Sequence, residues 1–512
     1  MNAHVKYALT IVVLGLVFIG AAKYGWPIWQ ERTQRATSDA RDTKGKLRIG
    51  VDNWIGYFPL CSGEMQKRMR VAGYVLVCED DKADYATRMQ RLKDGTLQFA
   101  VATVDAYLLN GAPKAFPGTI VAVIDESKGG DAIVAWKNRV ADLDGLKRMQ
   151  GVKVAFTPNS PSEHLLRATA VHFDIQALRG KGPWRIESDG SPDALKKLLA
   201  RQADVAVLWE PDVTRALSTE GLVKLLGTED TRRLIVDVLL VNRAFSAEDP
   251  AAVTALLAGY FQVLREYREN SQRLEQAVAE STRLPAQSVR RLLAGVEWTS
   301  LSDNFQTWLG SASGGDALVD AIHAAVRILV DAGEFKASPL PDQDPYRIIN
   351  RQFLSAVYVK SVTGQKAPVA DAPSLERKFS ALSDGGWAAL KAVGTLKAVP
   401  VVFQSGTAEL SYEGKIELDR AMETLAHYPN FRVVIKGHTA LRGDAAENQR
   451  LSEERAEAAA RYLNVTYNVD RNRVRVIGLG SEQPLAREAG ESDRAYAYRL
   501  PRVELSLVAE AL

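Results

Sequence analysis

The stretch KLRIGVDNWIGYFPLCSGEMQKRMRVAGYVLVCED, residues 46–80, decides the fold class. Leu47, Ile49 and Val51 alternate as in a strand, a helical stretch covers 60–71, and YVLVCED is typical of a second strand. The alternation continues in FAVATVD, TIVAVID, VKVAF, DVAVLW and LIVDVLLVN. Strands that recur between helical stretches predict an α/β fold with mainly parallel sheets covered on both faces.

Composition narrows the class of protein. The chain has 512 residues, which suggests roughly two to four domains. Its net charge of +3 gives no ground for a nucleic-acid partner, and two cysteines exclude a disulfide framework. HExxH, CxxC and Walker-type motifs are missing from the sequence. We therefore expect no metal, no cofactor and no enzymatic activity.

The N-terminal run YALTIVVLGLVFIGAAKYGWPIW, residues 7–29, is apolar apart from Lys23. It exceeds the roughly 20 residues that cross a bilayer core, so residues 1–29 are predicted to be a cytoplasmic tip and transmembrane anchor with the bulk in the periplasm. Gly20 and Ala22 keep open the alternative of a signal peptide that is cleaved on export to the periplasm. Residues 30–46 are predicted to form a polar stalk.

Polar residues follow several of the predicted strands. They occupy 52–54, 103–105, 126–131 and 157–162. Ligands of parallel α/β sheets collect at the carboxyl ends of strands, where helix N-termini offer N–H groups. Each segment alone fits an ordinary helix cap, but four together predict a ligand cleft.

Residues 47–335 resemble type II periplasmic solute-binding proteins, especially the taurine, sulfonate and nitrate binders of ABC importers. The resemblance rests on RIGVDNWIGYFPL, LKDGTLQFAVATVDAYL, VIDESKGGDAIVA, GVKVAFTPNSPSEHLL, ADVAVLWEP and DVLLVNRAFSAEDPAAVTALLAGYF. It implies two lobes that close about a hinge on a small anion or zwitterion. It also implies a set of residues at or near the cleft: Asn53, Trp54, Thr103, Ser127, Asp131, Ser160, Ser162, Trp209 and Glu210.

One departure from that resemblance concerns charge. The strand-end segments contain no Arg to clamp an anion, whereas Asp52, Asp105, Asp131 and Glu210 make the predicted mouth acidic. Burying an anion beside unpaired carboxylates is costly. The ligand is therefore expected to be zwitterionic or partly cationic, or the domain has lost its small ligand.

The two cysteines fall in the first strand–helix–strand unit. Cys61 opens the first helix, Cys78 ends the second strand, and both points lie on one edge of a parallel unit. A disulfide between them fits an oxidising compartment, with two buried free thiols as the alternative.

Residues 336–398 are predicted to be a linker with one helical segment at 346–362. From 399 to 512 the expected order is strand (VPVVF), helix, strand (FRVVIKG), helix, strand (RVRVIGLG) and strand (RVELSLV). Two amphipathic helices on one side of a small mixed sheet make an α/β sandwich.

This C-terminal region resembles the OmpA-like peptidoglycan-binding domain. The resemblance rests on FQSGTAELSYEGKIEL, VVIKGHTALRGDAAENQRLSEERAEAAARYL, VIGLGSEQP and RVEL. It implies a site for the amine and carboxylate of diaminopimelate, with Asn448, Arg455 and Arg502 in the family's positions. The position of the family's Asp is Ala440, which predicts weakened peptidoglycan binding unless Asp444 replaces that Asp.

Taken together, the sequence predicts a membrane-anchored periplasmic solute-binding or sensing protein that docks on the cell wall. A structural envelope protein whose two-lobed domain binds a protein partner is the alternative. An ion-driven stator subunit is disfavoured, because residues 7–29 contain no Asp or Glu to carry ions.

Overall fold

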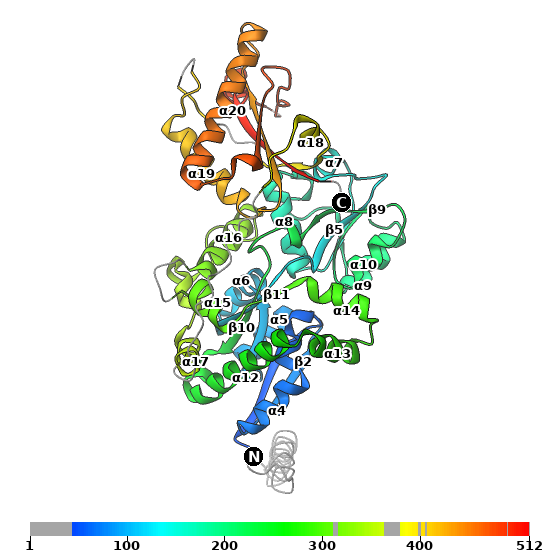
Figure 1. Cartoon of the computed structure of the whole chain (residues 1–512), viewed down its shortest axis with the longest axis vertical. Helices are drawn as coiled ribbons and strands as arrows, with labels where there is room; N and C mark the ends of the chain where they lie inside the picture. Colours follow the sequence, from blue (N-terminus) through cyan, green and yellow to red (C-terminus); the bar gives the residue numbers. More distant parts are fainter. Residues whose placement is uncertain are drawn as a thin grey trace, which may run out of the picture.

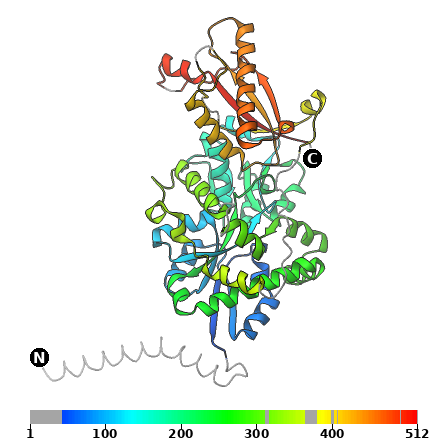
Figure 2. The same cartoon turned by 60° about the vertical axis from the view of Figure 1, so that its left-hand side comes forward.

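The structure is a computed structural model that describes residues 43–310, 316–362, 379–397, 401–404, 407–488 and 490–510. The predicted anchor (1–29) and most of the predicted stalk (30–46) lie outside these ranges. Within them, we find no helix with the length and apolar character needed to cross a membrane. Figures 1 and 2 show a column of three parts. Two α/β lobes, which we call lobe 1 and lobe 2, lie at the bottom and in the middle, and the C-terminal domain lies at the top.

Lobe 1 is built around a six-stranded sheet with the order β11-β4-β10-β3-β1-β2. β1 is parallel to β2 and β3, whereas β10 is antiparallel to β3 and β4, and β11 is antiparallel to β4. The strands are β1 (Gly45–Val51), β2 (Tyr74–Asp80), β3 (Phe99–Thr103), β4 (Gly118–Ser127), β10 (Val236–Asn242) and β11 (Val296–Trp298).

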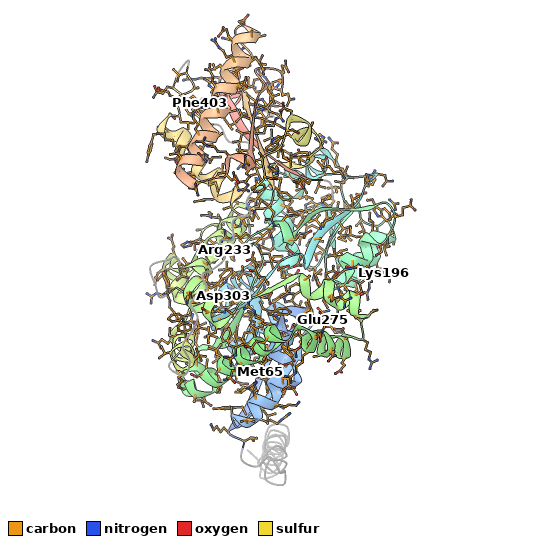
Figure 3. All side chains as sticks on the ribbon, viewed as in Figure 1. Met65, Lys196, Arg233, Glu275, Asp303 and Phe403 are labelled. Atoms are coloured by element: carbon orange, nitrogen blue, oxygen red, sulfur yellow. A yellow bond between two sulfur atoms is a disulfide. The ribbon has the colours of Figure 1, made fainter. Side chains whose placement is uncertain are left out.

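Lobe 2 is built around a five-stranded sheet with the order β7-β6-β8-β5-β9. β6 is parallel to β7 and β8, and β5 is antiparallel to β8 and β9. The strands are β5 (Asp131–Trp136), β6 (Val154–Phe156), β7 (Arg185–Glu187), β8 (Val205–Trp209) and β9 (Leu222–Gly227). In Figure 3, Met65 marks lobe 1 and Lys196 marks lobe 2.

The prediction of mainly parallel sheets is wrong, because both sheets are mixed. Parallel neighbours need a crossover, usually a helix, between them. Here β4 passes into lobe 2 as β5 through three residues, and β9 returns to lobe 1 as β10 through a short segment. A strand that enters directly from the other lobe joins its sheet antiparallel to its neighbours.

Helices cover the sheets of both lobes (Figure 1). In lobe 1 they are α3 (Phe58–Cys61), α4 (Gly63–Val71), α5 (Tyr85–Lys93), α6 (Val104–Gly111), α11 (Arg243–Glu248), α12 (Pro250–Glu269), α13 (Ser271–Thr282), α14 (Ala286–Ala294), α16 (Ala317–Asp331) and α17 (Gln352–Val362). In lobe 2 they are α7 (Leu143–Arg148), α8 (Pro161–His172), α9 (Ser191–Leu199) and α10 (Asp212–Leu217). Cys61 of α3 and Cys78 of β2 form a disulfide.

The C-terminal domain has a four-stranded sheet with the order β12-β15-β13-β14. Its elements are α18 (Asp384–Ala388), β12 (Lys391–Thr395), α19 (Tyr412–Leu425), β13 (Arg432–His438), α20 (Ala445–Tyr467), β14 (Val474–Gly478), α21 (Asp493–Arg499) and β15 (Arg502–Ala509). Residues 401–403 of the predicted strand VPVVF lie outside this sheet, with a single bridge from Phe403 to Leu410. The edge position belongs to β12, inside the predicted linker, because pairing with β15 makes a strand of the weakly patterned segment KAVGT.

The C-terminal domain shares a core with lobe 2. The buried ring of Tyr428 lies edge-on to Phe173, with centroids 5.4 Å apart, and its hydroxyl is 2.8 Å from Nδ1 of His172. The backbone N–H of Arg232 also donates to the carbonyl of His427 at 2.9 Å. These buried contacts fix the domain to lobe 2.

Candidate functional site

Two short segments, Ser127–Asp131 and Gly227–Val236, connect the lobes side by side. The N–H of Ser127 donates to the carbonyl of Ile235 at 3.1 Å. The hydroxyl of Thr228 accepts from the N–H groups of Gly129 and Asp131 at 2.9 and 3.1 Å. Gly129 has φ +109°, which favours glycine. The segments form the hinge that the resemblance implied.

A cavity of 30 Å³ lies beside this hinge and is lined from both lobes. That volume exceeds the room one water molecule needs. Five of the predicted cleft residues line it: Asn53, Trp54, Asp131, Ser160 and Trp209. The other lining residues are Asp52, Tyr57, Ala83, Tyr85, Pro161, Ile235 and Asp237. We call this space the inter-lobe cavity.

The remaining predicted residues, Thr103, Ser127, Ser162 and Glu210, do not line the cavity. Ser127 lies behind it and donates its hydroxyl to Oδ2 of Asp131 at 2.6 Å. Glu210 accepts from the hydroxyl of Thr214 at 2.7 Å, which ties its carboxylate to α10. Ser160, which does line the cavity, donates its hydroxyl to the carbonyl of Thr157 at 2.7 Å.

Sequence reasoning missed a pair of carboxyls, Asp125 and Asp237, that face each other across β4 and β10. Trp54 Nε1 donates to Oδ1 of Asp125 at 3.1 Å, and the hydroxyl of Tyr57 donates to Asp237. Burial raises the pKa of Asp125 to about 7. Burial, with the charge of Asp125 next in weight, raises the pKa of Asp237 well above its ordinary value. An acid within the apolar run LIVDVLLVN was the available signal for Asp237.

The only guanidinium beside the cavity within the described residues is already paired. Arg88 is fully buried, and its Nη2 lies 3.1 Å from Asp52 and 2.5 Å from Asp81. Its Nη1 donates to the carbonyl of Val101 at 2.8 Å. Four of the five N–H donors of Arg88 are thus used within the protein, and its charge is balanced by two carboxylates, so it is not available as a clamp for an anionic ligand.

Asp131 has no comparable cation. Its carboxylate accepts from Ser127, and the nearby charges of Asp105 and Glu210 are negative. Burial first, and then these two acids, raise the pKa of Asp131 to about 7. None of the cavity-lining residues, all in the described part of the chain, is Lys, Arg or His.

A second group of buried polar atoms lies at the start of α6 in lobe 1 and of α8 in lobe 2. They are Thr103 Oγ1, both carboxylate oxygens of Asp105, Thr157 Oγ1, Ser162 Oγ and His164 Nδ1. None has a hydrogen-bond partner within the described residues. Asp105 Oδ2 and His164 Nδ1 lie 4.0 Å apart, and burial lowers the pKa of His164. We call these atoms the inter-lobe polar set.

A larger groove of 1120 Å³ opens on the outside of lobe 1, between α12 and α17. Its lining residues contribute none of the unpartnered buried polar atoms found within the described ranges. In those ranges, no three His, Cys, Asp or Glu side chains are grouped to hold a metal ion. We therefore place the candidate ligand site at the inter-lobe cavity.

The C-terminal domain carries a separate candidate site on α20. Arg455 is buried, its Nε donates to the carbonyl of Thr407 at 3.2 Å, and its Cζ lies 4.9 Å from the ring centre of Phe403. Burial lowers the pKa of Arg455. No carboxylate of the described residues lies within 4.0 Å of it.

The other predicted wall-binding residues are engaged within the domain. Asn448 donates to the carbonyl of Arg442 at 3.1 Å. Arg502 contacts Glu504 at 2.7 Å and the carbonyl of Gln483 at 2.9 Å. Asp444 caps α20 by accepting from the N–H of Glu447 at 3.0 Å. Of these residues, Arg455 alone presents a buried charge without an opposite one.

Comparison with known proteins gives different matches for the two ends of the chain. Residues 402–497 match the OmpA family. The chain is 36% identical over 86 residues to a peptidoglycan-associated lipoprotein of Rhizobium meliloti (strain 1021), which covers 17% of this chain and 48% of that protein. It is 32% identical over 111 residues to outer membrane porin F of Pseudomonas aeruginosa, or 22% of this chain and 31% of the porin. The chain thus spans less than half of these curated relatives.

Among solved structures, the periplasmic aliphatic sulphonate binding protein SsuA from Escherichia coli matches with a TM-score of 0.47 and 16% identity. It covers 61% of this chain and 100% of that chain. The periplasmic nitrate-binding protein NrtA from Synechocystis PCC 6803 matches with a TM-score of 0.46 and 14% identity, covering 65% and 93%.

Proposed function

We propose that this chain is a membrane-anchored periplasmic solute-binding or sensing protein that docks on the cell wall through its OmpA-like domain. The observation that carries the proposal is the inter-lobe cavity. Residues of both lobes line it, and two hinge segments run directly beside it. A solute held there touches both lobes at once, so its binding energy favours the closed arrangement over any open one.

The charge of the cavity supports a zwitterionic solute over a purely anionic one. Asp52, Asp131 and Asp237 line the space, and the neighbouring Arg88 is paired with two carboxylates. An anion would enter against unpaired acids and would lose hydration without gaining a cation. A solute with an ammonium group avoids that cost.

The layout of the chain supports the proposed tether. β1, the first described strand, starts at the bottom of the column, and the C-terminal domain lies at the opposite end (Figure 1). An anchor at residues 7–29 would hold lobe 1 near the cytoplasmic membrane, with the OmpA-like domain on the far side. The relative named a peptidoglycan-associated lipoprotein supports the cell wall as the partner of that domain.

Peptidoglycan binding by this domain is proposed to be weak. Arg455 offers a guanidinium for a carboxylate, but Ala440 offers no charge for an amine. The proposal includes no catalytic activity. The polar groups of the inter-lobe cavity are carboxyls, phenols, indoles, the amide of Asn53 and the hydroxyl of Ser160. That hydroxyl donates to the carbonyl of Thr157 and is not paired with a general base.

The test is a thermal-unfolding screen of the full chain in detergent against amino acids, amines, sulfonates, phosphonates, nitrate and phosphate. A true ligand at 100 times its Kd should stabilise the protein by about 2.7 kcal/mol. A positive shift for one chemical class supports solute binding. A flat screen on folded protein would instead support the structural envelope protein with a protein partner.

A further inference from the structure

Two of the acids that line the inter-lobe cavity lack a counter-ion. Asp52 is neutralised by the buried Arg88 at 3.1 Å. Asp237 is hydrogen-bonded to Asp125 and to the hydroxyl of Tyr57. Asp131 receives the hydroxyl of Ser127 at 2.6 Å, and neither Asp131 nor Asp237 has a cation partner within the described residues. A hydroxyl donor offsets part of the cost of burying a carboxylate but supplies no positive charge.

The inter-lobe polar set is a second group of buried polar atoms at the junction of the lobes. Thr103, Asp105, Ser162 and His164 are each at least 99% buried, and the atoms named above have no hydrogen-bond partner within the described residues. Native proteins leave very few buried polar atoms unpaired, so such a group indicates that water or a solute reaches this junction. Asp105 from α6 lies opposite His164 from α8, with 4.0 Å between Oδ2 and Nδ1. These residues do not line the inter-lobe cavity, but the negative charge of Asp105 acts on Asp131, which does.

We infer that the bound solute is a small organic ammonium compound, whose cationic nitrogen lies against the carboxylate of Asp131. This inference rests on the proposed function and narrows its solute to a compound that needs no anionic group. The rest of the lining fits the same class, because Trp54, Tyr57, Tyr85 and Trp209 surround the space with aromatic rings. Aromatic rings attract cationic nitrogen and accommodate its carbon substituents.

The volume of the cavity fits a head group. With 30 Å³ between the lobes, the space holds about two water-sized groups, such as an ammonium nitrogen and its first carbon. The remainder of a larger solute would extend toward the inter-lobe polar set, where hydroxyls of Thr103 and Ser162 lack partners.

The inference predicts a pH dependence of affinity. Asp131 must be ionised to hold a cation, and burial raises its pKa to about 7, so binding releases a proton near neutral pH. The charged groups that face it are Asp105 from α6, Asp125 from β4, Asp237 from β10 and Glu210 after β8. All four are acids, so each of their negative charges opposes the ionisation of Asp131 and favours a bound cation. The affinity for an ammonium compound should rise about tenfold from pH 6 to pH 8.

The experiment uses the full chain in detergent and three sets of probes. Methylammonium, choline and putrescine are compared with carbon-matched carboxylates and with carbon-matched sulfonates, by thermal shift and then by calorimetric titration. We expect stabilisation by at least one ammonium compound and by none of the acids. Binding of acids alone would overturn the ammonium inference and leave the proposed solute-binding function standing. A flat response to every probe would overturn both.

Asp131→Asn separates charge from shape. The amide keeps the size of the side chain and can still accept from Ser127, so the fold should survive. We expect at least tenfold weaker binding of the ammonium probe and the loss of its pH dependence. Glu220→Gln, an exposed acid outside the cavity, is the matched control and should bind as the parent does. If Asp131→Asn unfolds, Asp131→Ser makes the same test; a full pH dependence in the folded variant would overturn the inference.

Discussion

The inter-lobe cavity and the Arg455 site of the C-terminal domain differ in the sign of their unpaired charge. In the cavity, Asp131 and Asp237 are buried without a cation. On α20, Arg455 is buried without a carboxylate in the described residues, and the position expected to supply the neighbouring acid is Ala440. A buried charge without its partner costs several kcal/mol, and a ligand can provide the missing half. Under the functions proposed above, a ligand from outside the chain supplies the missing charge at both sites.

Arg88 serves as a reference for this comparison, because it is a buried charge whose opposite charges come from within the chain. Removing it leaves Asp52 and Asp81 facing each other at full burial cost. Arg88→Met should therefore lower the free energy of unfolding of lobe 1 by about 3–5 kcal/mol, measured by chemical denaturation. Arg91→Met, which removes a half-exposed partner of Glu79, is the control and should cost about 1 kcal/mol or less. Equal losses in the two variants would mean that breaking the buried ion pairs of Arg88 costs no more than breaking a partly exposed pair.

The unpaired acids should appear in the pH dependence of stability without ligand. Burial raises the pKa of Asp131 to about 7, above the roughly 3.9 of an unfolded chain, so the folded state binds the extra proton between these values. The contribution is fully present below pH 4 and is lost as the pH rises through 7, with an upper bound of about 4 kcal/mol. We expect the unfolding midpoint to fall from pH 5 to pH 8. Asp131→Asn should flatten that slope, whereas Glu220→Gln should retain it.

How far the sequence predicted this cavity depends on the type of information required. Strands such as TIVAVID and DVAVLW follow from local pattern and are found as β4 and β8. The pairing of Asp125 with Asp237 depends on the register of β4 against β10, which no local pattern contains. From local sequence, Arg88 would be expected on the exposed face of a helix. Its burial is explained only by the fold, which brings Asp52 and Asp81 to the same sheet edge. The prediction of mainly parallel sheets was wrong for the same reason, because the directions of β5 and β10 are set by the two segments that cross between the lobes.

The proposed ligand site around Arg455 can be tested by restoring the acid that is missing at position 440. Ala440→Asp should strengthen retention on purified sacculi by about tenfold, because a charge-assisted contact to an amine contributes about 1.5–3 kcal/mol. Arg455→Ala should lower the retention that the parent protein has. Arg461→Ala changes an exposed arginine on the same helix that pairs with Glu457, and should leave retention unchanged. If neither Ala440→Asp nor Arg455→Ala alters sedimentation, the wall-binding function proposed for this domain is wrong.

The smallest effect is expected at Asp444, the nearest candidate to replace the acid lost at position 440. Its carboxylate already caps α20 through the N–H of Glu447 at 3.0 Å, and a side chain that caps a helix is turned toward the backbone. Asn caps helices about as well as Asp, so Asp444→Asn should leave the fold and its stability intact. We expect retention on sacculi to change by less than about twofold, within what a solvent-exposed charge contributes. A loss as large as that of Arg455→Ala would mean that the chain does supply both halves of the pair at this site, and that the contrast with the inter-lobe cavity holds only for the cavity.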